Sequence, residues 1–379
     1  MPVRLLHLGD LHLGWNSERL GDQAGERAEE FAQALLRAID FALEPDRRID
    51  AVLMTGDQFE TRAPQKRELD FFRAQLQRLA DANKPAVMIP GTHDGYFYTD
   101  CVYRHEEFPS AHIITRPNID EPLTLDINGE KVYFYGMAYS PARSKKPFDE
   151  FQRKDLPGVH VALIHGSVVL NPEWDDGSLE APLRIELLLQ SRMHYIALGH
   201  YHSFRQWDGE QCVAAYCGSL ERKKARDSAP RVLVVAELDG KGARIETHPF
   251  DAREVIERQI DLTALDDLSA EALADRLCEE LPEGCIAKVA LEGSVETPLP
   301  LADVQEYLSE RCFHLELDDQ TLVWQSGQLE QWSQEPTIRG AFIKRMKKRI
   351  EPAKPEEVAP LNLALKLALA EFMRSEENE

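Results

Sequence analysis

Acidic and histidine side chains stand at the points where five short apolar segments of this sequence end. The segments have the composition of buried strands, and most of them end beside a glycine. The side chains are Asp10, His12, Asp57, His93, Asp94, His165, His200 and His202. Because open α/β sheets bind ligands outside the carboxyl ends of their strands, we expect these side chains to converge at one edge. The neighbouring glycines allow the sharp turns that this convergence needs.

The donor types predict a centre with two metal ions. Carboxylate oxygen and imidazole nitrogen suit Mn²⁺, Fe²⁺, Co²⁺ and Zn²⁺. The set is too large for one tetrahedral zinc site, but it suits two ions about 3.5–4 Å apart that share a carboxylate. Such ions acidify a water molecule and neutralise charge on a phosphoryl group. A histidine that is not a ligand would then protonate the leaving oxygen.

The first two-thirds of the chain alternates apolar segments with helical patterns. Strands are expected at 3–10, 49–57, 84–91, 131–138, 159–166, 194–200, 211–218 and 231–238, and helices at 24–43 and 67–83. This order predicts a layered α/β fold whose strands are covered on both faces. The later strands follow one another closely, which indicates that part of the sheet structure is antiparallel.

The pattern of predicted strands and helices changes near residue 252. Residues 252–335 read strand, helix, strand, helix, strand, which predicts a small α+β domain. Residues 336–379 contain a basic amphipathic helix at 337–350, a Pro- and Glu-rich break at 351–360 and an apolar helix at 361–373. An apolar helix of this kind should be buried, either on the chain's own domain or on a partner.

The composition of the chain limits the classes of function and the compartment that we expect. The net charge of −22 argues against nucleic-acid binding by bulk charge. Basic clusters at 143–147, with Arg153 and Lys154, and at 221–226 could contact phosphate or form a solvated face. The six cysteines form no CxxC pair, so neither a zinc knuckle nor a redox motif is expected. With no signal peptide and no membrane-spanning segment, we expect a cytoplasmic protein with reduced thiols and no membrane partner.

Five motifs carry a family resemblance: "GDLHLG" (9–14), "GDQFE" (56–60), "PGTHDG" (90–95), "IHGS" (164–167) and "GHYHS" (199–203). In this order they resemble the calcineurin-like metallophosphoesterase superfamily. Within it, the chain is similar to the SbcD-type DNA repair exonucleases, and "AAYCGSLER" (214–222) adds to that similarity. The resemblance implies a β-sandwich flanked by helices in a nuclease domain at 1–251, a capping domain at 252–335 and C-terminal helices at 336–379.

The resemblance also implies individual roles. Asp10, His12 and His202 would bind one metal, Asp57 would bridge, and His165 and His200 would bind the second. His93 would act on the transition state, with Asp94 as its orienting partner. The ions would be two Mn²⁺ and the substrate DNA. The partner implied is an SMC-like (SbcC-type) coiled-coil ATPase gripped by the C-terminal helices, and a homodimer is compatible with this.

Two positions depart from the family pattern. Thr92 stands where the usual motif has an asparagine ligand of the second metal. Its hydroxyl either reaches that metal, leaves the place to a water, or holds the turn by bonding to backbone. Glu60 stands where some members have a second catalytic histidine, and it is either a solvated loop charge or part of the site.

Three functions therefore compete. The first is a metal-dependent DNA nuclease working in DNA repair with an ATPase partner. The second is a phosphoesterase of nucleotides or small molecules, which the acidity of the chain mildly favours. The third is a non-catalytic scaffold that has lost a ligand at Thr92. Aromatic residues near the motifs (Trp15, Tyr96, Phe97 and Tyr98) would stack on bases in a nuclease or simply pack in the core.

Overall fold

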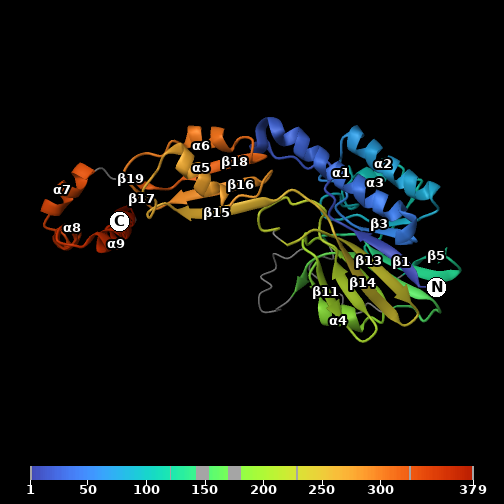
Figure 1. Ribbon diagram of the computed structural model, residues 1–379. Coiled ribbons are helices and arrows are strands. Elements are labelled where there is room, and N and C mark those ends of the chain that lie inside the picture. Colours follow the sequence, from blue (N-terminus) through green and yellow to red (C-terminus); the bar gives the residue numbers. More distant parts are fainter. Residues whose placement is uncertain are drawn as a thin grey trace. The chain divides into compact units, whose positions relative to one another are not determined.

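The computed structural model describes residues 2–119, 121–141, 153–169, 181–227, 229–323 and 326–377 (Figure 1). The chain forms two compact units. The first is Met1–Lys223 with Asp227–Ala252, and the second is Lys224–Arg226 with Arg253–Glu379. The basic cluster predicted at 143–147 lies outside the described residues.

The first unit is built on two six-stranded sheets. One has the order β14 (Gly242–Pro249), β13 (Val232–Asp239), β1 (Val3–Leu8), β2 (Ala51–Thr55), β3 (Ala86–Ile89), β4 (Ala111–Ile113). The other has the order β11 (Arg205–Asp208), β12 (Val213–Tyr216), β10 (Tyr195–Gly199), β7 (Val159–His165), β6 (Glu130–Met137), β5 (Leu123–Ile127). Strands β1 to β4 are parallel, as are β12, β10, β7 and β6. Strands β13, β14, β11 and β5 pair antiparallel, as the close spacing of the later strands indicated.

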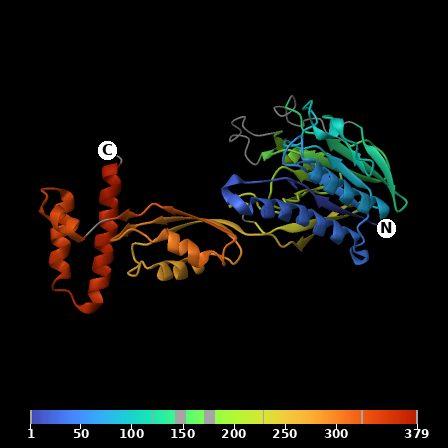
Figure 2. The ribbon, with the colours of Figure 1, turned by 90° about the horizontal axis from the view of Figure 1, so that it is seen from above.

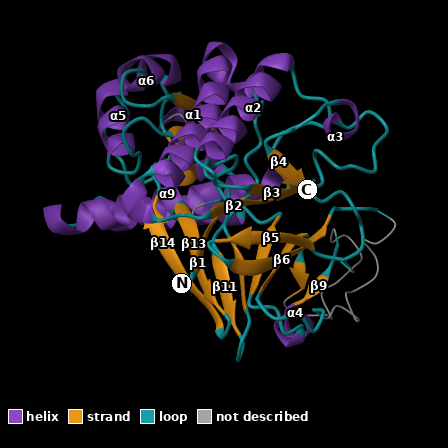
Figure 3. Ribbon diagram, turned by 90° about the vertical axis from the view of Figure 1, so that its right-hand side faces the viewer, coloured by secondary structure: helices purple, strands orange, loops and turns teal. Residues whose placement is uncertain are grey.

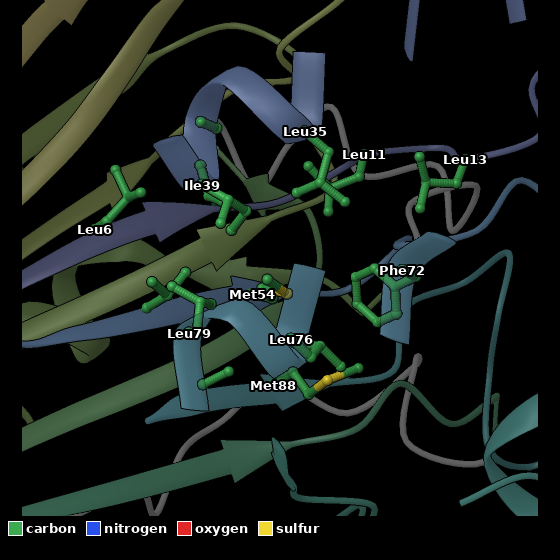
Figure 4. Packing of buried hydrophobic residues seen from close by; sticks show 14 of the residues in the cluster. Leu6, Leu11, Leu13, Leu35, Ile39, Met54, Phe72, Leu76, Leu79 and Met88 are labelled. Carbon is green, nitrogen blue, oxygen red and sulfur yellow. The ribbon is translucent and has the colours of Figure 1, made fainter. Parts of the chain in front are cut away.

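Alternation of side chains along the strands divides the core into layers. In β1, Leu6 and Leu8 face one hydrophobic cluster, whereas Val3 and Leu5 face another that lies between the two sheets. The first cluster packs against α1 (Ala24–Leu43) and α2 (Lys66–Asp81), whose apolar side chains interleave with those of the strands (Figure 4). A third hydrophobic cluster lies on the outer face of the second sheet. It includes Ile185 and Leu188 of α4 (Ile185–Gln190), the helix labelled in Figure 3. The predicted layered α/β fold with flanking helices is confirmed.

The described residues of the first unit also form smaller elements. They are η1 (Glu18–Gln23), η2 (Pro45–Arg47), α3 (Val102–His105), β8 (Val168–Val169) and β9 (Leu183–Arg184). Of these, β8 and β9 form a separate parallel pair.

The second unit begins with alternating strands and helices. Its parallel sheet contains β15 (Val255–Asp261), β16 (Ile286–Glu292) and β18 (His314–Asp319), joined through α5 (Ala270–Cys278) and α6 (Leu301–Leu308). A second parallel pair is formed by β17 (Ser294–Val295) and β19 (Leu322–Val323). The Ser269 hydroxyl caps α5 by accepting a bond from the Ala272 N–H at 3.3 Å. The order strand, helix, strand, helix, strand is the one expected from the sequence, whereas the separate domain at 252–335 stays a prediction.

Three helices end the chain: α7 (Ser326–Gln334), α8 (Ile338–Ile350) and α9 (Pro355–Glu377), the last seen as a long red helix in Figure 2. They share a small hydrophobic cluster that includes Leu329, Ile343 and Leu369. The break expected at 351–360 is wrong in its second half, because α9 already begins at Pro355 and contains Pro360. Proline is favoured at a first helical position, so Pro355 starts the helix rather than ending one.

Candidate metal centre

The predicted site residues meet where β1, β2, β3, β7 and β10 end. Three of them have a left-handed backbone, with φ of 50° at Asp10, 47° at His12 and 52° at Asp57, and His200 has φ of 109°. Such angles are uncommon for residues other than glycine and concentrate at functional sites. The loops hold one another in place, since the Asp10 N–H donates to the Gly56 carbonyl at 3.0 Å and the His12 N–H to the Asp57 carbonyl at 2.9 Å.

One cluster of donors consists of Asp10, His12 and His202. Their candidate ligand atoms lie within 4.8 Å of one another, and the Nε2 atoms of His12 and His202 are 3.2 Å apart. The Asp10 carboxylate is held by the His200 N–H, which lies 3.0 Å from each of its oxygens. These residues are the ones that the family resemblance assigned to the first metal.

A second cluster consists of Asp10, Asp57 and His165, all buried. His165 Nδ1 lies 2.8 Å from the Thr55 carbonyl, so the Nδ1–H donates there and Nε2 is the nitrogen that a proton or a metal ion can occupy. His165 Nε2 is buried, has no hydrogen-bond partner and faces Asp57 Oδ2 at 3.5 Å. Buried polar atoms are normally satisfied, so this orphaned nitrogen beside a carboxylate fits a bound cation.

The geometry makes Asp10 the residue common to both clusters. Asp57 lies between His165 and the Thr92 turn, and the His93 N–H donates to its Oδ1 at 2.8 Å. The assignment of the bridge to Asp57 stays a prediction. So does the assignment of His200, whose ring centroid is 5.3 Å from that of His165.

Thr92 turns its hydroxyl toward a carboxylate rather than toward backbone. The hydroxyl lies 3.2 Å from Oδ2 and 3.5 Å from Oδ1 of Asp57. It therefore supports the carboxylate that faces His165. Its role as a direct ligand stays a prediction.

The His93 ring lies at the edge of the site. Its centroid is 4.8 Å from that of His12, and 39% of its side chain is exposed. Nδ1 lies 2.9 Å from the backbone carbonyl of Glu60. The bond to this main-chain carbonyl orients the ring.

The resemblance implied that Asp94 orients the His93 ring, but its carboxylate contacts other groups. Its carboxylate accepts bonds from the Gly91 N–H at 2.7 Å, the Gln58 N–H at 2.9 Å and the Tyr103 hydroxyl at 2.7 Å. Burial, and after it the charge of Asp57, raises the pKa of Asp94 to about 6. These contacts join the turn after β3 to the loop after β2.

Two glycines let the strand ends approach closely. A Cβ on Gly91 would lie 2.2 Å from Asp57 Oδ1, so only glycine leaves room for the carboxylate. Gly56 has φ of +96°, and a Cβ there would lie 2.4 Å from His165 Nδ1. The site is thus packed around its candidate ligands.

Electrostatics give most of the donors a state suited to metal binding. Burial opposes ionisation of Asp57, but His165 holds the pKa of that carboxyl well below its usual range. Burial lowers the pKa of His12, and burial together with His165 lowers that of His200 to about 4. Burial works against the charge on His165, yet Asp57 raises its pKa to about 10. A cation between these two side chains would therefore replace a proton.

The candidate ligands are held from outside by further acceptors. His12 Nδ1 lies 2.8 Å from Glu60 Oε2, and His202 Nδ1 lies 3.3 Å from Asp227 Oδ2. Such partners commonly orient the histidine ligands of metals. With the carboxylate and imidazole donors and the orphaned His165 nitrogen, the residues present fit divalent ions.

Sequence reasoning missed Asp227 and Lys223. Lys223 belongs to the basic cluster at 221–226, and a solvated face is wrong for its first part because Glu221 and Arg222 are buried. Lys223 instead bonds to Glu60 at 2.7 Å. That basic cluster was the only signal for Lys223, and nothing in the sequence pointed to Asp227.

The neighbouring aromatic residues pack against the first unit's core. Trp15 stacks on Phe31 at 5.1 Å between ring centroids. Tyr96 and Tyr98 contact the cluster beneath α1 and α2. The packing interpretation therefore holds for these residues.

Comparison with known proteins places this fold and site in a family. The calcineurin-like phosphoesterase family matches residues 3–204, more than half of the chain. The chain belongs to this family, as the five motifs predicted. Among the described residues, no helix combines the length and the apolar composition needed to cross a bilayer.

Several relatives carry a DNA repair name. The chain is 27% identical over 306 residues to the DNA double-strand break repair protein Mre11 of Haloferax volcanii, which covers 79% of this chain and 64% of the relative. It is 26% identical to the protein of the same name from Halobacterium salinarum, over 82% of this chain and 75% of that one. It is 22% identical to the uncharacterized metallophosphoesterase YhaO of Bacillus subtilis, over 85% and 80%. The chain thus spans slightly less than two thirds of the first of these relatives.

Proposed function

We propose that this protein is a metal-dependent DNA nuclease that hydrolyses phosphodiester bonds, with Mn²⁺ as the expected ion. The observation that carries the proposal is the buried convergence of two donor clusters on Asp10, beside the unpartnered His165 Nε2. DNA as the substrate is supported by the Mre11 relatives, whose name refers to repair of DNA breaks. Asp57 is the proposed bridging ligand, with His200 and Thr92 on the side of the second ion.

Two ions bound here would supply an acidified water and neutralise charge on the phosphoryl group. His93 supplies the proton for the leaving oxygen in this proposal. Its Nδ1–H stays on the Glu60 carbonyl at 2.9 Å, so a protonated ring presents its Nε2–H to the substrate. Asp94 keeps the turn that carries His93 in place through its bonds to Gly91 and Gln58.

A nuclease assay tests this function. The purified chain is incubated with Mn²⁺ and end-labelled single- or double-stranded DNA, and separately with mononucleotides and small phosphodiesters. We expect DNA cleavage that chelator abolishes and that is lost in Asp57→Ala. Turnover of small esters alone would favour the second candidate, a small-molecule phosphoesterase, which the net charge of −22 also favours. A chain that binds two ions but turns over no substrate would favour the third candidate, a non-catalytic scaffold.

We further propose that α8 and α9 hold an SMC-like coiled-coil ATPase. Both helices bury apolar residues among themselves, yet Ile338 is 81% exposed and Leu367 is 45% exposed. The helices thus pack on their own chain and still expose apolar side chains to solvent. The first feature agrees with burial on the chain itself, and the second supports a surface for a partner. The capping role of residues 252–335 and a homodimer belong to the same proposal.

Point variants test the partner better than removal of α8 and α9, because Leu329 of α7 packs with Ile343 of α8 and would lose that cover. Ile338→Asp with Leu367→Asp should abolish co-purification with a co-expressed SMC-like ATPase and leave cleavage of short oligonucleotides intact. Tyr307→Asp, at a residue 60% exposed on α6, is the matched control. Retained co-purification in the double variant would contradict the proposal.

A further inference from the structure

The Glu60 carboxylate lies between a candidate ligand and a lysine. Oε2 of Glu60 is 2.8 Å from His12 Nδ1 and 2.7 Å from Lys223 Nζ. Lys223 Nζ is also 3.2 Å from His12 Nδ1, and only 9% of the lysine side chain is exposed. Glu60 is therefore neither a solvated charge nor remote from the site.

These distances leave two hydrogen-bond patterns for His12. If Nδ1 carries the proton, it donates to Glu60, and the lone pair of Nε2 faces His202 Nε2 at 3.2 Å. If the Lys223 ammonium donates to Nδ1 instead, the proton must sit on Nε2, where it would occupy the place of a metal. The two patterns exclude each other, because a nitrogen that holds a proton cannot accept one.

We infer that Glu60 is a positioning residue that selects the metal-binding tautomer of His12 by drawing both the Nδ1–H and the Lys223 ammonium onto its carboxylate. This inference rests on the metal site of the proposed function. The positive charge of Lys223 balances the negative charge of the Glu60 carboxylate, 2.7 Å away. Without Glu60, the same ammonium would turn to Nδ1 and block the ligand.

Glu60 also fixes the second functional histidine, by another group. Its backbone carbonyl accepts from His93 Nδ1 at 2.9 Å. One residue therefore orients His12 through its side chain and His93 through its main chain. A side-chain substitution can separate these tasks, since it leaves the carbonyl in place.

A different role is a third cation site, because candidate ligand atoms of His12, Glu60 and His93 lie within 4.8 Å of one another. The Lys223 ammonium, 2.7 Å from Glu60, already supplies a positive charge there. We therefore favour positioning over ligation. A third bound ion is an outcome that the experiment can show.

The test compares Glu60→Ala, Lys223→Met and the double variant in calorimetric titrations with Mn²⁺. Glu60→Ala should weaken the tighter ion by about 10–100-fold, the usual cost of losing an outer partner. The double variant should bind more tightly than Glu60→Ala, because the ammonium that blocks His12 is gone. Asp70→Asn, which removes an exposed ion pair with Lys66 on α2, is the control for an unrelated carboxylate.

Nitrogen NMR of the His12 ring in the metal-free protein gives a second readout that does not depend on activity. Wild type and Lys223→Met should carry the proton on Nδ1, and Glu60→Ala should carry it on Nε2. Equal loss of affinity in Glu60→Ala and the double variant, an unchanged tautomer, or a third ion lost with Glu60 would each overturn the inference. If Glu60→Ala does not fold, a proton on Nε2 in Lys223→Met would still contradict it, and a proton on Nδ1 would support it.

The proposed function can fail separately. A wild-type chain that binds Mn²⁺ and shows these tautomers but cleaves no DNA would refute the nuclease and leave the role of Glu60 standing.

Discussion

The Thr92 hydroxyl lies 3.2 Å from Asp57 Oδ2, the same oxygen that faces His165 Nε2 at 3.5 Å. The residue that departs from the family motif thus contacts the carboxylate proposed to bridge the two ions. Threonine is about one bond shorter than asparagine, so its direct reach is less. We therefore expect its contribution to be mainly to hold Asp57 in orientation.

Substitutions at Thr92 should change the second ion more than the first. Thr92→Asn should tighten the second Mn²⁺ and raise activity at low Mn²⁺. Thr92→Val keeps the shape but loses the bond to Asp57. It should weaken that ion by up to about 10-fold, the equivalent of a hydrogen bond worth about 0.5–1.5 kcal/mol. Two equally tight ions in all three proteins, measured by titration, would show that Thr92 never limits the site.

His93→Gln should slow turnover at least ~10²-fold while both ions stay bound. The reason is that the His93 ring contacts the Glu60 carbonyl at 2.9 Å and lies beside His12 without joining either acidic cluster around Asp10. The measurement is kcat together with metal content. His112→Gln, at an exposed position of β4, is the matched control. Parallel loss of metal and activity would make His93 a ligand instead.

His7 should make the stability of the metal-free protein depend on pH. It is fully buried between the Tyr195 hydroxyl at 2.7 Å and the Thr55 hydroxyl at 3.1 Å, and burial lowers its pKa from 6.5 to about 3. Below pH 6.5 the unfolded chain therefore binds a proton that the folded chain does not. The free energy of unfolding should therefore fall by up to about 1.4 kcal/mol for each unit by which the pH is lowered from 6.5 toward about 3.

The measurement is denaturant unfolding between pH 4 and 8 in the presence of chelator. His7→Gln should show a shallower pH slope than wild type by up to one proton, while His112→Gln keeps the wild-type slope. Equal slopes in wild type and His7→Gln would mean that His7 is not the group responsible.

The convergence of the site could be predicted because strand ends of parallel sheets meet. The segments that end at Asp10, Asp57 and His165 have clear strand patterns, and all three donors form one cluster. What the pattern could not show is the backbone between them. The left-handed φ of Asp10 and Asp57 arises from bonds between loops that are far apart in sequence.

Neighbours in sequence were a poor guide to contacts inside a turn. Asp94 follows His93, yet its carboxylate bonds to Gly91 and Gln58, whereas the His93 ring bonds to Glu60. Adjacent side chains of a turn point in different directions, so adjacency does not predict a contact. Asp227 reaches His202 from a loop that carries no motif.

The metal content of Asp57→Ala decides whether Asp57 holds both ions. Asp57 is buried, lies 3.5 Å from His165 and is held by the His93 N–H at 2.8 Å. If it bridges, its loss removes an anionic ligand from both ions. Elemental analysis should find two Mn²⁺ per wild-type chain, and none together with no DNA cleavage in Asp57→Ala. An Asp57→Ala chain that keeps the wild-type metal content, or keeps one tight ion on Asp10, would contradict the account.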